Sequence, residues 1–235
     1  MSLPQVVSRE EWLEARLRLL AAEKELTRKH DAVNADRRRL PMVEVTENYV
    51  FEGPSGQVSL AELFDGKRQL LVQHVMFGAD WEQPCPSCSV AISSMTPTLF
   101  DNIRSRETNF VLVSVAPYAK IDKAKAERGW DVPWYSSFGT SFNKDYGVTI
   151  DPAKPRYNYR DEPSLTEATE LPGVSAFLRD GDSVYHTYSA YARGNEYIPH
   201  AYSFLDMTAL GRQEAWEEPK GRSDAVRDGD PSFSS

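Results

Sequence analysis

The sequence predicts an α/β sandwich with a mixed central sheet, preceded by one long helix. Two continuous apolar segments, residues 69–77 and 109–117, are typical of parallel strands that are buried on both faces. Helical patterns follow each of them, and this alternation of strand and helix indicates βαβ connections. The turn sequence RDGD at 179–182 then joins two more apolar segments and indicates an antiparallel hairpin. We therefore expect one principal domain whose sheet contains both parallel and antiparallel strands.

Composition limits the class of protein. The chain has 235 residues, of which 40% are hydrophobic, enough for one sizeable core. Its 35 acidic and 27 basic residues give a net charge of -8, which opposes binding to nucleic acid or to an anionic membrane. No apolar run approaches the roughly 18 residues that a membrane span needs, and the first residues do not resemble a secretory signal. We expect a cytoplasmic protein without a nucleic-acid or membrane partner.

Residues 8–39 carry a long helical pattern. Ser8 and Glu11 match a capping box at its start, and Pro41 stops the helix. Apolar residues then recur at alternating steps of three and four, which places them on one face: Trp12, Ala15, Leu19, Ala22 and Leu26. We treat residues 1–40 as a helical extension. Its apolar stripe needs a covering surface, either the chain's own domain or a second subunit, so a homodimer through this helix is one expectation.

The domain is expected to begin with short strands and a tight turn. Residues 43–51 contain two short strand patterns, and GPSG at 53–56 is a turn signal that indicates a hairpin. Ser59 and Glu62 match a second capping box, which opens a short helix. The apolar segment 69–77 follows, and its lack of polar alternation predicts a central strand with helices on both sides.

The middle of the chain continues the alternation. Apolar residues between 90 and 103 recur at helical spacing, and Pro97 can kink that helix. After the second buried strand, residues 118–128 form a charged helical pattern that Gly129 can terminate. A third short strand is expected around Trp134.

The last third of the chain contains a loop, a hairpin and a tail. Residues 151–172 are polar and aperiodic, which indicates a functional or mobile loop. Two strands, Val174–Leu178 and Val184–Tyr188, form the hairpin. We place the folded domain at 41–215. Residues 216–235 have no periodic apolar face, so we expect a disordered tail.

The chain's two cysteines, Cys85 and Cys88, lie between a buried strand and a helix. The functional edge of such a sheet lies beyond the carboxyl ends of its strands. A cysteine at a helix start meets exposed backbone N–H groups, which favour its thiolate, so Cys85 is the candidate nucleophile. Cys88, three residues later, can attack a mixed disulfide on Cys85 and resolve it. Pro86 is suited to the first helical position.

The CPSC motif after a buried strand resembles the CxxC of the thioredoxin superfamily. Three longer segments resemble the bacterial DUF899 family: MFGADWEQPCPSCS, APYAKIDKAKAERGWDVPWYSSFGTSFNKDYGV and VYHTYSAYARG. The resemblance covers the chain from about Arg9 to Arg212. It implies a thioredoxin-like core with an N-terminal helical extension, similar to peroxiredoxin-like and thiol-disulfide reductase proteins. The activity of the family is poorly defined.

The resemblance has two departures. Peroxiredoxins carry a PxxxTxxC arrangement, whereas this chain has other residues before its first cysteine: Asp80, Trp81, Glu82 and Pro84. Peroxidase chemistry is therefore less favoured than disulfide exchange. Thioredoxins have a cis-proline that faces the CxxC just before a strand, and Pro172 is the candidate for that position in this sequence.

Several further residues complete the candidate site. The supporting loop consists of Asp80, Trp81, Pro84, Pro86 and Ser87. Arg193 is a candidate anion contact near the nucleophile. A single CxxC supplies two of the four ligands that zinc usually takes. Histidines could supply the others, and the candidates are His74, His186 and His200. Each is more often a structural residue, so we assign no metal and no cofactor.

The pattern therefore favours a thiol-disulfide oxidoreductase that acts on a thiol or disulfide of a protein or small molecule. Two alternatives stay open: a peroxiredoxin-like peroxide reductase, and a non-catalytic thioredoxin-fold protein that binds a ligand or handles metal.

Overall fold

The computed structural model describes residues 4–195. The helices are α1 (Arg9–Arg37), α2 (Pro86–Ser93), α3 (Pro97–Arg104), α4 (Tyr118–Arg128) and α5 (Phe142–Asp145), with the 3-10 turns η1 (Glu62–Phe64) and η2 (Ala192–Asn195). The strands are β1 (Val43–Glu44), β2 (Val50–Gly53), β3 (Gly56–Ser59), β4 (Gln69–His74), β5 (Thr108–Ser114), β6 (Trp134–Ser136), β7 (Thr149–Ile150), β8 (Arg156–Tyr157), β9 (Arg160–Asp161), β10 (Thr169–Glu170), β11 (Gly173–Asp180) and β12 (Ser183–Tyr191). His200 and the expected disordered tail at 216–235 lie outside the described residues.

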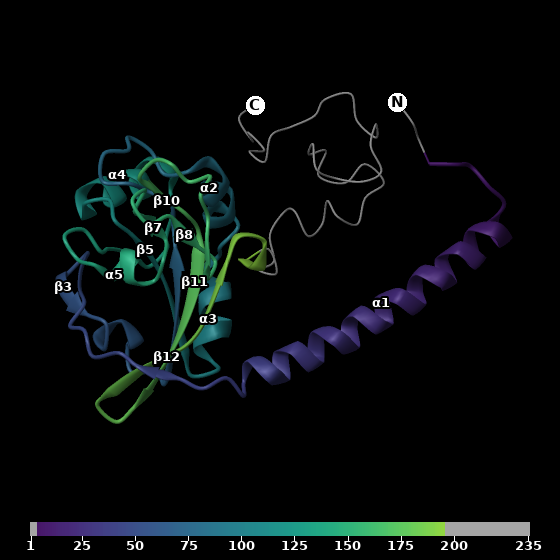
Figure 1. Cartoon of the computed structure of the whole chain (residues 1–235), viewed down its shortest axis with the longest axis horizontal. Coiled ribbons are helices and arrows are strands. Elements are labelled where there is room, and N and C mark those ends of the chain that lie inside the picture. The colour runs from purple at the N-terminus through teal and green to yellow at the C-terminus, as the bar shows by residue number, and fades with distance from the viewer. Residues whose placement is uncertain (1–3, 196–235) are drawn as a thin grey trace.

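One eight-stranded mixed sheet organises the domain, in the order β1-β12-β11-β4-β5-β6-β2-β3. β4, β5 and β6 are parallel, and the connections through α2, α3 and α4 are the predicted βαβ units. β11 pairs antiparallel with β4 and forms the predicted hairpin with β12 (Figure 1). The predicted α/β sandwich with a mixed central sheet is thus confirmed, with β4 and β5 at its centre.

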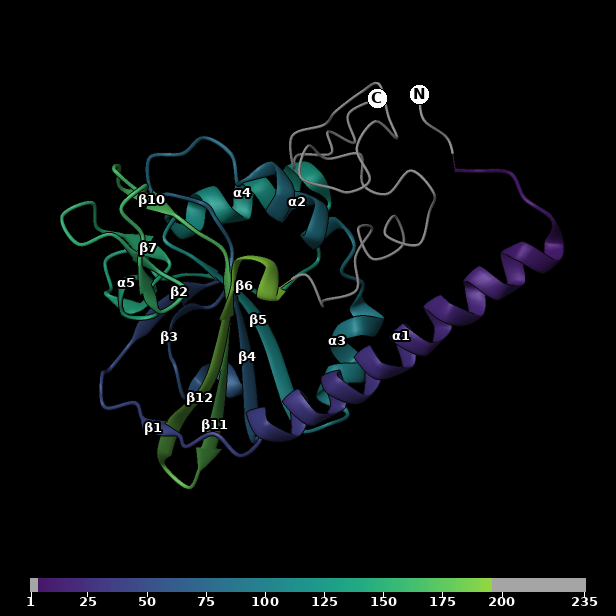
Figure 2. The same cartoon turned by 45° about the vertical axis from the view of Figure 1, so that its right-hand side comes forward.

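Side chains that alternate along the central strands pack into two cores, one on each face of the sheet. Val111 and Val113 of β5 pack with Phe142 of α5 on one face. Leu112 points to the other face and packs with Ile121 of α4, in a core to which α2 and α3 also contribute (Figure 2). This double covering explains why both central strands read as continuous apolar segments.

The ends of some elements differ from the sequence expectation. β4 ends at His74, although the apolar run predicted a strand to Phe77. The Val75 N–H still bonds the Val113 carbonyl, and the chain then leaves the sheet toward the cysteines. The loop at 151–172 is not structureless, since it contains β8 paired with β9, and β10 paired with β7. Pairs of two residues are too short to give a periodic sequence signal.

Local signals at the turns are confirmed. Ser59 and Glu62 form the predicted capping box, with a Glu62 carboxylate oxygen 2.7 Å from the Ser59 nitrogen. The capped segment is a short 3-10 turn. Gly129 ends α4 with a φ of 65°, a backbone conformation that favours glycine.

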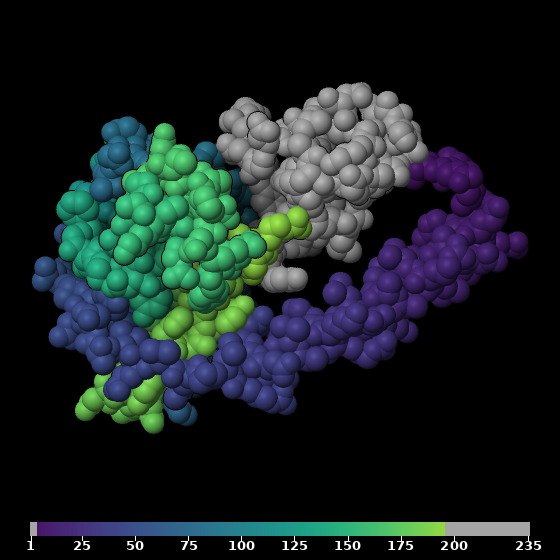
Figure 3. All heavy atoms as spheres, viewed as in Figure 1, coloured from purple at the N-terminus to yellow at the C-terminus, as the bar shows by residue number. Residues whose placement is uncertain are grey.

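Helix α1 is correctly predicted in position, and its last turn lies against the sheet, where the Arg37 guanidinium is 4.6 Å from the centre of the Tyr188 ring. The Ser8 and Glu11 capping box is formed. None of its 29 residues is buried against the rest of the described chain, and Leu26 is 66% exposed. The helix leaves the sheet near β11 and extends away from the domain (Figures 1 and 3). A covering surface for the apolar stripe of α1, on its own domain or on a second subunit, stays a prediction.

The helices of the described residues were compared with what a membrane-spanning helix requires. Neither α1 nor any other helix within residues 4–195 combines the length and apolar content needed to cross a bilayer.

A chain of buried polar side chains crosses β4, β11 and β12. His74 Nε2 lies 2.9 Å from the Ser175 hydroxyl, which lies 2.8 Å from the Ser189 hydroxyl. That hydroxyl is 2.8 Å from His186 Nε2. Burial, with the nearby His186 as a smaller cause, lowers the pKa of His74 to about 3. Burial also lowers the pKa of His186. Both imidazoles are therefore neutral at pH 7.

We predict that the buried His74 makes the fold sensitive to acid. Its pKa is lower in the folded protein than the ordinary 6.5, so the unfolded chain binds more protons as the pH falls below 6.5. Its contribution to stability is complete above pH 6.5 and decreases as the pH falls toward 3. Between pH 7 and pH 5, this one group should remove about 2 kcal/mol from the free energy of unfolding.

Urea denaturation of wild type and His74→Gln at both pH values measures this difference. The variant should lose stability at pH 7 but show a smaller decrease between pH 7 and pH 5. His30→Gln, which removes an exposed histidine of α1, is the matched control. Equal pH dependence in wild type and His74→Gln would contradict the assignment.

Candidate functional site: the CPSC dithiol

Cys85 and Cys88 lie where the chain returns from the end of β4 and begins α2. Cys85 is the N-cap, with an extended backbone at φ -50° and ψ 133°, and Pro86 occupies the first turn as predicted. The Cys85 N–H donates to the Met76 carbonyl over 2.9 Å. The Cys85 carbonyl accepts the first helical hydrogen bond from the Ser89 N–H, also over 2.9 Å. The nucleophile candidate is thus fixed between the strand end and the helix start.

The two sulfur atoms lie in different environments. Cys88 is 7% exposed and packs in the core that contains Phe77, Ile92 and Trp134. Cys85 is only partly buried at the margin of that core, and both residues are thiols. A partner molecule can therefore approach Cys85 from solvent, while Cys88 is reached mainly from Cys85.

The electrostatics of the two thiols also differ. The Cys88 S–H donates to the Cys85 sulfur and, with the backbone N–H groups of Cys88 and Ser87, lowers the pKa of Cys85 to about 6 despite partial burial. The same interaction raises the pKa of Cys88 well above its ordinary value, and burial raises it further. At pH 7 the pair therefore holds a thiolate at Cys85 and a protonated thiol at Cys88, as expected for a nucleophile and a resolving thiol.

The loop before the cysteines is held by α4. Lys120 Nζ donates to the Ala79 carbonyl over 3.1 Å and to the Trp81 carbonyl over 3.0 Å. The Trp81 indole lies over Gly78, where an added Cβ would be only 2.7 Å from the ring, so only glycine fits. Trp81 of the predicted supporting loop is thus packed, and Pro84 is buried as well.

The other members of the supporting loop have less contact. Asp80 and Pro86 are exposed, and Ser87 is half-buried. Ser87 also contributes its side-chain hydroxyl to lowering the Cys85 pKa. The role of Asp80 stays a prediction.

Pro172 lies at the same end of the sheet as the dithiol. It directly precedes β11, whose Gly173 is paired with His74 at the end of β4. The Tyr157 hydroxyl donates to the Pro172 carbonyl over 2.6 Å and accepts from the Ala192 N–H over 2.9 Å. Burial raises the pKa of Tyr157 to about 12.

Two residues that hold this region together were not predicted from the sequence. Lys120 occurs in a charged helix where nothing distinguishes it from its neighbours, and Tyr157 occurs in an aperiodic loop. Arg193, the predicted anion contact, is exposed in η2, next to the Ala192 that Tyr157 binds. Its role toward Cys85 stays a prediction.

The metal-binding alternative gains no support from the described residues. Within 4–195, no three His, Cys, Asp or Glu side chains form a group that could hold a metal ion. His74 and His186 are engaged in the serine chain described above, and His200 lies outside the described residues.

The chain resembles known proteins at two levels. The family model DUF899, described as a bacterial protein of unknown function, matches residues 1–230. No curated protein sequence matches the chain. Among solved structures, a cysteine-to-serine mutant of PrxQ from Xylella fastidiosa is 10% identical with a TM-score of 0.46, over 66% of this chain and 89% of that chain.

Two other solved structures show the same distant likeness. A cysteine-to-serine mutant of peroxiredoxin Q from Xanthomonas campestris is 10% identical with a TM-score of 0.47, over 65% of this chain and 86% of that chain. A candidate thiol:disulfide interchange protein DsbE from Chlorobium tepidum is 13% identical with a TM-score of 0.40, with the same two shares covered. At these values the likeness carries no functional argument.

We predict that Cys85 reacts with iodoacetamide as a low-pKa thiol. Its alkylation rate should reach half its maximum near pH 6, because the thiolate is the reactive form. Cys88 should stay unmodified over the same time. Mass spectrometry of peptides from the reduced protein, alkylated between pH 5 and pH 10, measures both rates.

Two substitutions at Cys88 separate the causes that lower the pKa of Cys85. Cys88→Ala removes the S–H donor and should move the midpoint of Cys85 alkylation upward by at least one pH unit, whereas Cys88→Ser keeps a hydroxyl donor and should move it less. Identical midpoints in both variants and wild type would show that Cys88 does not set the pKa of Cys85.

We also predict that the Tyr157 hydroxyl stabilises the fold around Pro172. Tyr157→Phe removes two hydrogen bonds to backbone groups and should lower the free energy of unfolding by about 1–3 kcal/mol. Tyr159→Phe removes one bond to the Ser189 carbonyl from an exposed residue and should cost less. Urea denaturation of both variants checks the difference, and an equal loss would contradict a special role for Tyr157.

Proposed function

The chain belongs to the DUF899 family, bacterial proteins of unknown function, and we propose that it is a thiol-disulfide oxidoreductase whose reactive pair is Cys85 and Cys88. The observation that carries the proposal is the asymmetry of the two thiols. Cys85 is accessible with a lowered pKa, and Cys88 is buried with a raised pKa. Disulfide exchange needs this combination, because one sulfur must attack as a thiolate while the other stays a protonated thiol until the mixed disulfide has formed.

The first step is attack by the Cys85 thiolate on one sulfur of a substrate disulfide. A bond forms between Cys85 and that sulfur, the substrate S–S bond breaks, and the second substrate sulfur leaves as a thiolate. The Cys88 S–H no longer donates to a thiolate once Cys85 is bonded. One cause of its raised pKa is thereby removed, which favours its deprotonation.

The second step is attack by Cys88 on the Cys85 sulfur. The intramolecular disulfide forms, the mixed disulfide breaks, and the substrate leaves with both of its sulfurs reduced. Two electrons have passed from the dithiol to the substrate, and an external dithiol must return them before the next cycle. The two cysteines carry these electrons themselves, so the proposed reaction needs no bound cofactor.

The surroundings of the dithiol suggest how a substrate is held. The Trp81 carbonyl accepts from Lys120 in the segment that precedes the dithiol, and the Pro172 carbonyl accepts from Tyr157 at the same end of the sheet. We propose that Trp81 and Pro172 form the surface on which a protein or small-molecule disulfide lies against Cys85, within a domain that spans 41–215. Arg193 is the proposed contact for an anionic group of the substrate. The proposed location is the cytoplasm.

Peroxide reduction is the second candidate, because the lowered pKa of Cys85 suits it equally well. In that reaction the thiolate attacks a peroxide oxygen, the O–O bond breaks, and an alcohol or water leaves while Cys85 becomes a sulfenic acid. Cys88 then condenses with it to form the same disulfide and releases water. The two activities differ only in the electrophile, so one set of variants tests both. A non-catalytic binding or metal-handling role is the third candidate.

We expect wild-type protein to catalyse the reduction of an insulin or glutathione disulfide by dithiothreitol. Cys85→Ser should reduce the rate at least 100-fold, because no nucleophile remains. Cys88→Ser should allow the first step only and accumulate a mixed disulfide, which mass spectrometry detects as an adduct on Cys85. Hydrogen peroxide and an alkyl hydroperoxide, tested in parallel, show which electrophile is preferred.

The outcomes separate the three candidates. If wild type turns over disulfides and both variants do not, the result supports the proposal. If wild type turns over only peroxides, the result supports the second candidate. If both variants match wild type with every substrate, the dithiol is not catalytic. Metal analysis of protein purified without chelator then tests the third candidate.

A further inference from the structure

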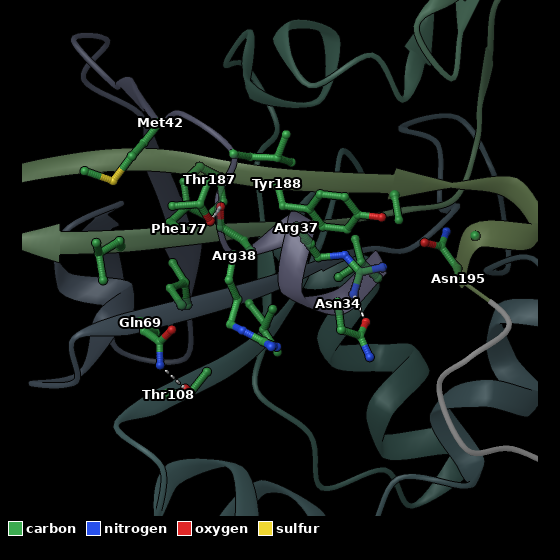
Figure 4. Close-up of a pocket in the computed structure, with 18 of the residues that line it drawn as sticks. Asn34, Arg37, Arg38, Met42, Gln69, Thr108, Phe177, Thr187, Tyr188 and Asn195 are labelled. Atoms are coloured by element: carbon green, nitrogen blue, oxygen red, sulfur yellow. Dashed lines mark hydrogen bonds between the residues drawn. The ribbon is translucent and has the colours of Figure 1, made fainter. Parts of the chain in front are cut away.

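A groove of about 790 Å³ lies between the last turns of α1 and the sheet (Figure 4). Its floor includes Leu71 of β4 and three residues of β11, Val174, Ala176 and Leu178. All four side chains are only half-buried, although β11 is an inner strand, with β12 on one side and β4 on the other. An apolar sheet face is stable when a second layer of structure covers it. The described residues leave this face of β11 incompletely covered.

The uncovered strip is continuous with one of the two cores. Leu71 lines the groove and also packs against the core that contains Phe110 and Leu112 of β5. At the rim of the groove, Leu40 and Met42 are 50% and 47% exposed. A segment that lies in the groove would therefore extend an existing core and remove further apolar surface from water.

The wall that α1 contributes to the groove is cationic. Arg37 and Arg38, at the end of the helix, line the groove, and the Arg37 guanidinium lies against the Tyr188 ring. Arg37 Nε is buried without a hydrogen-bond partner among the described residues. The described lining also contains no aspartate or glutamate, although the chain as a whole is acidic. The groove therefore fits an occupant that combines apolar side chains with carboxylates.

The chain itself leads into this groove where the described residues end. Gly194 and Asn195 both line it. Asn195 lies at one end of the lining and Met42 at the other (Figure 4). Residues 196–235 are thus tethered at one end of the groove, which gives them a high effective concentration there compared with any separate molecule.

The first part of that sequence has the composition that the groove requires. Residues 196–218 contain five acidic residues and one arginine, hence a net charge of -4. They also contain eight large apolar or aromatic side chains: Tyr197, Ile198, Tyr202, Phe204, Leu205, Met207, Leu210 and Trp216. Residues 219–235 have three acidic and three basic residues, and their only large apolar side chains are Val226 and Phe233. The match to the groove is therefore confined to 196–218.

This segment is also long enough to cover the groove. From Val174 to Leu178 the floor extends over four strand steps, about 13 Å. A helix covers that length with about nine residues and an extended segment with about four. Residues 196–218 can therefore reach along the floor in either conformation.

We propose that residues 196–218 fold back along the groove, place their apolar side chains on β11 and β12, and set carboxylates beside Arg37 and Arg38. The segment then completes the layer that covers this face of the sheet. The inference does not rest on the redox proposal, because the groove lies at the end of β4 opposite the dithiol. A second copy of the chain and a separate ligand are the other occupants that the experiments distinguish.

Photo-cross-linking of the full chain tests which segment lies in the groove. Met42→p-benzoylphenylalanine places a photoreactive ring at the rim. Irradiation at low micromolar concentration should join it to a peptide within 196–218, in a product that keeps the monomer mass of 26.6 kDa on a denaturing gel. Mass spectrometry of tryptic peptides identifies the partner. The matched control is Val50→p-benzoylphenylalanine, at an exposed residue of β2, which should give no cross-link to 196–218.

Further substitutions in the Met42 probe variant test the contacts themselves. Leu205→Gln with Leu210→Gln should lower the cross-link yield at least threefold, whereas Phe233→Gln, beyond the proposed segment, should leave it unchanged. Arg37→Glu with Arg38→Glu should lower the yield by a similar factor, because it sets like charges together. Arg37→Lys with Arg38→Lys keeps the charge and should lower the yield less.

Three results would overturn the proposal. A cross-linked product of twice the monomer mass would assign the groove to a second copy. Irradiation that gives no cross-link within 196–218 would leave the groove to a separate ligand. Equal yields in the leucine variant and the Phe233 control would show that the apolar side chains of the segment do not hold it there. The rate of Cys85 alkylation, measured in every variant, separates loss of the fold from loss of the contact.

Discussion

The pairing of β4 with β5 and β11 is the constraint on which the remaining structure depends. Buried on both faces, β4 ends at His74, and the next residues carry the chain from the sheet edge to Cys85. The same pairing fixes Gly173 beside His74, so the segment that contains Pro172 arrives at the dithiol end. His74 and Gly173, almost one hundred residues apart in sequence, are thus neighbours because the register between β4 and β11 requires it.

The chemistry at this end depends on how unequally the two thiols are solvated. A thiolate is stabilised where N–H and S–H donors converge, and Cys85 has both at the start of α2. Cys88 lies in the core, where an ion costs more, and so keeps its proton. Moving both cysteines to the surface would remove this difference. The apolar core around Cys88 is therefore as necessary to the proposed exchange as the sulfur atoms themselves.

Sequence patterns predicted the parts of the fold that local rules control. Capping boxes, the glycine that ends α4 and the continuous apolar runs of β4 and β5 each have a physical cause within a few residues, and each is found in the structure. Lys120 and Tyr157 were not predicted, because their partners are far away in sequence and their own surroundings look like any charged helix or polar loop. Amphipathic spacing indicates that one face of α1 needs covering but not by what, so the sequence leaves its own domain and a second subunit as alternatives.

A groove between the last turns of α1 and the sheet lies at the opposite end of β4 from the dithiol (Figure 4). Gln69 at the start of β4 lines the groove, while His74 at its other end leads to the cysteines. Six residues of strand put about 17 Å between these ends. An occupant of this groove would therefore leave Cys85 open to a disulfide of protein size. Binding in the groove and exchange at the dithiol can coexist on one small sheet because β4 separates the two places by its length.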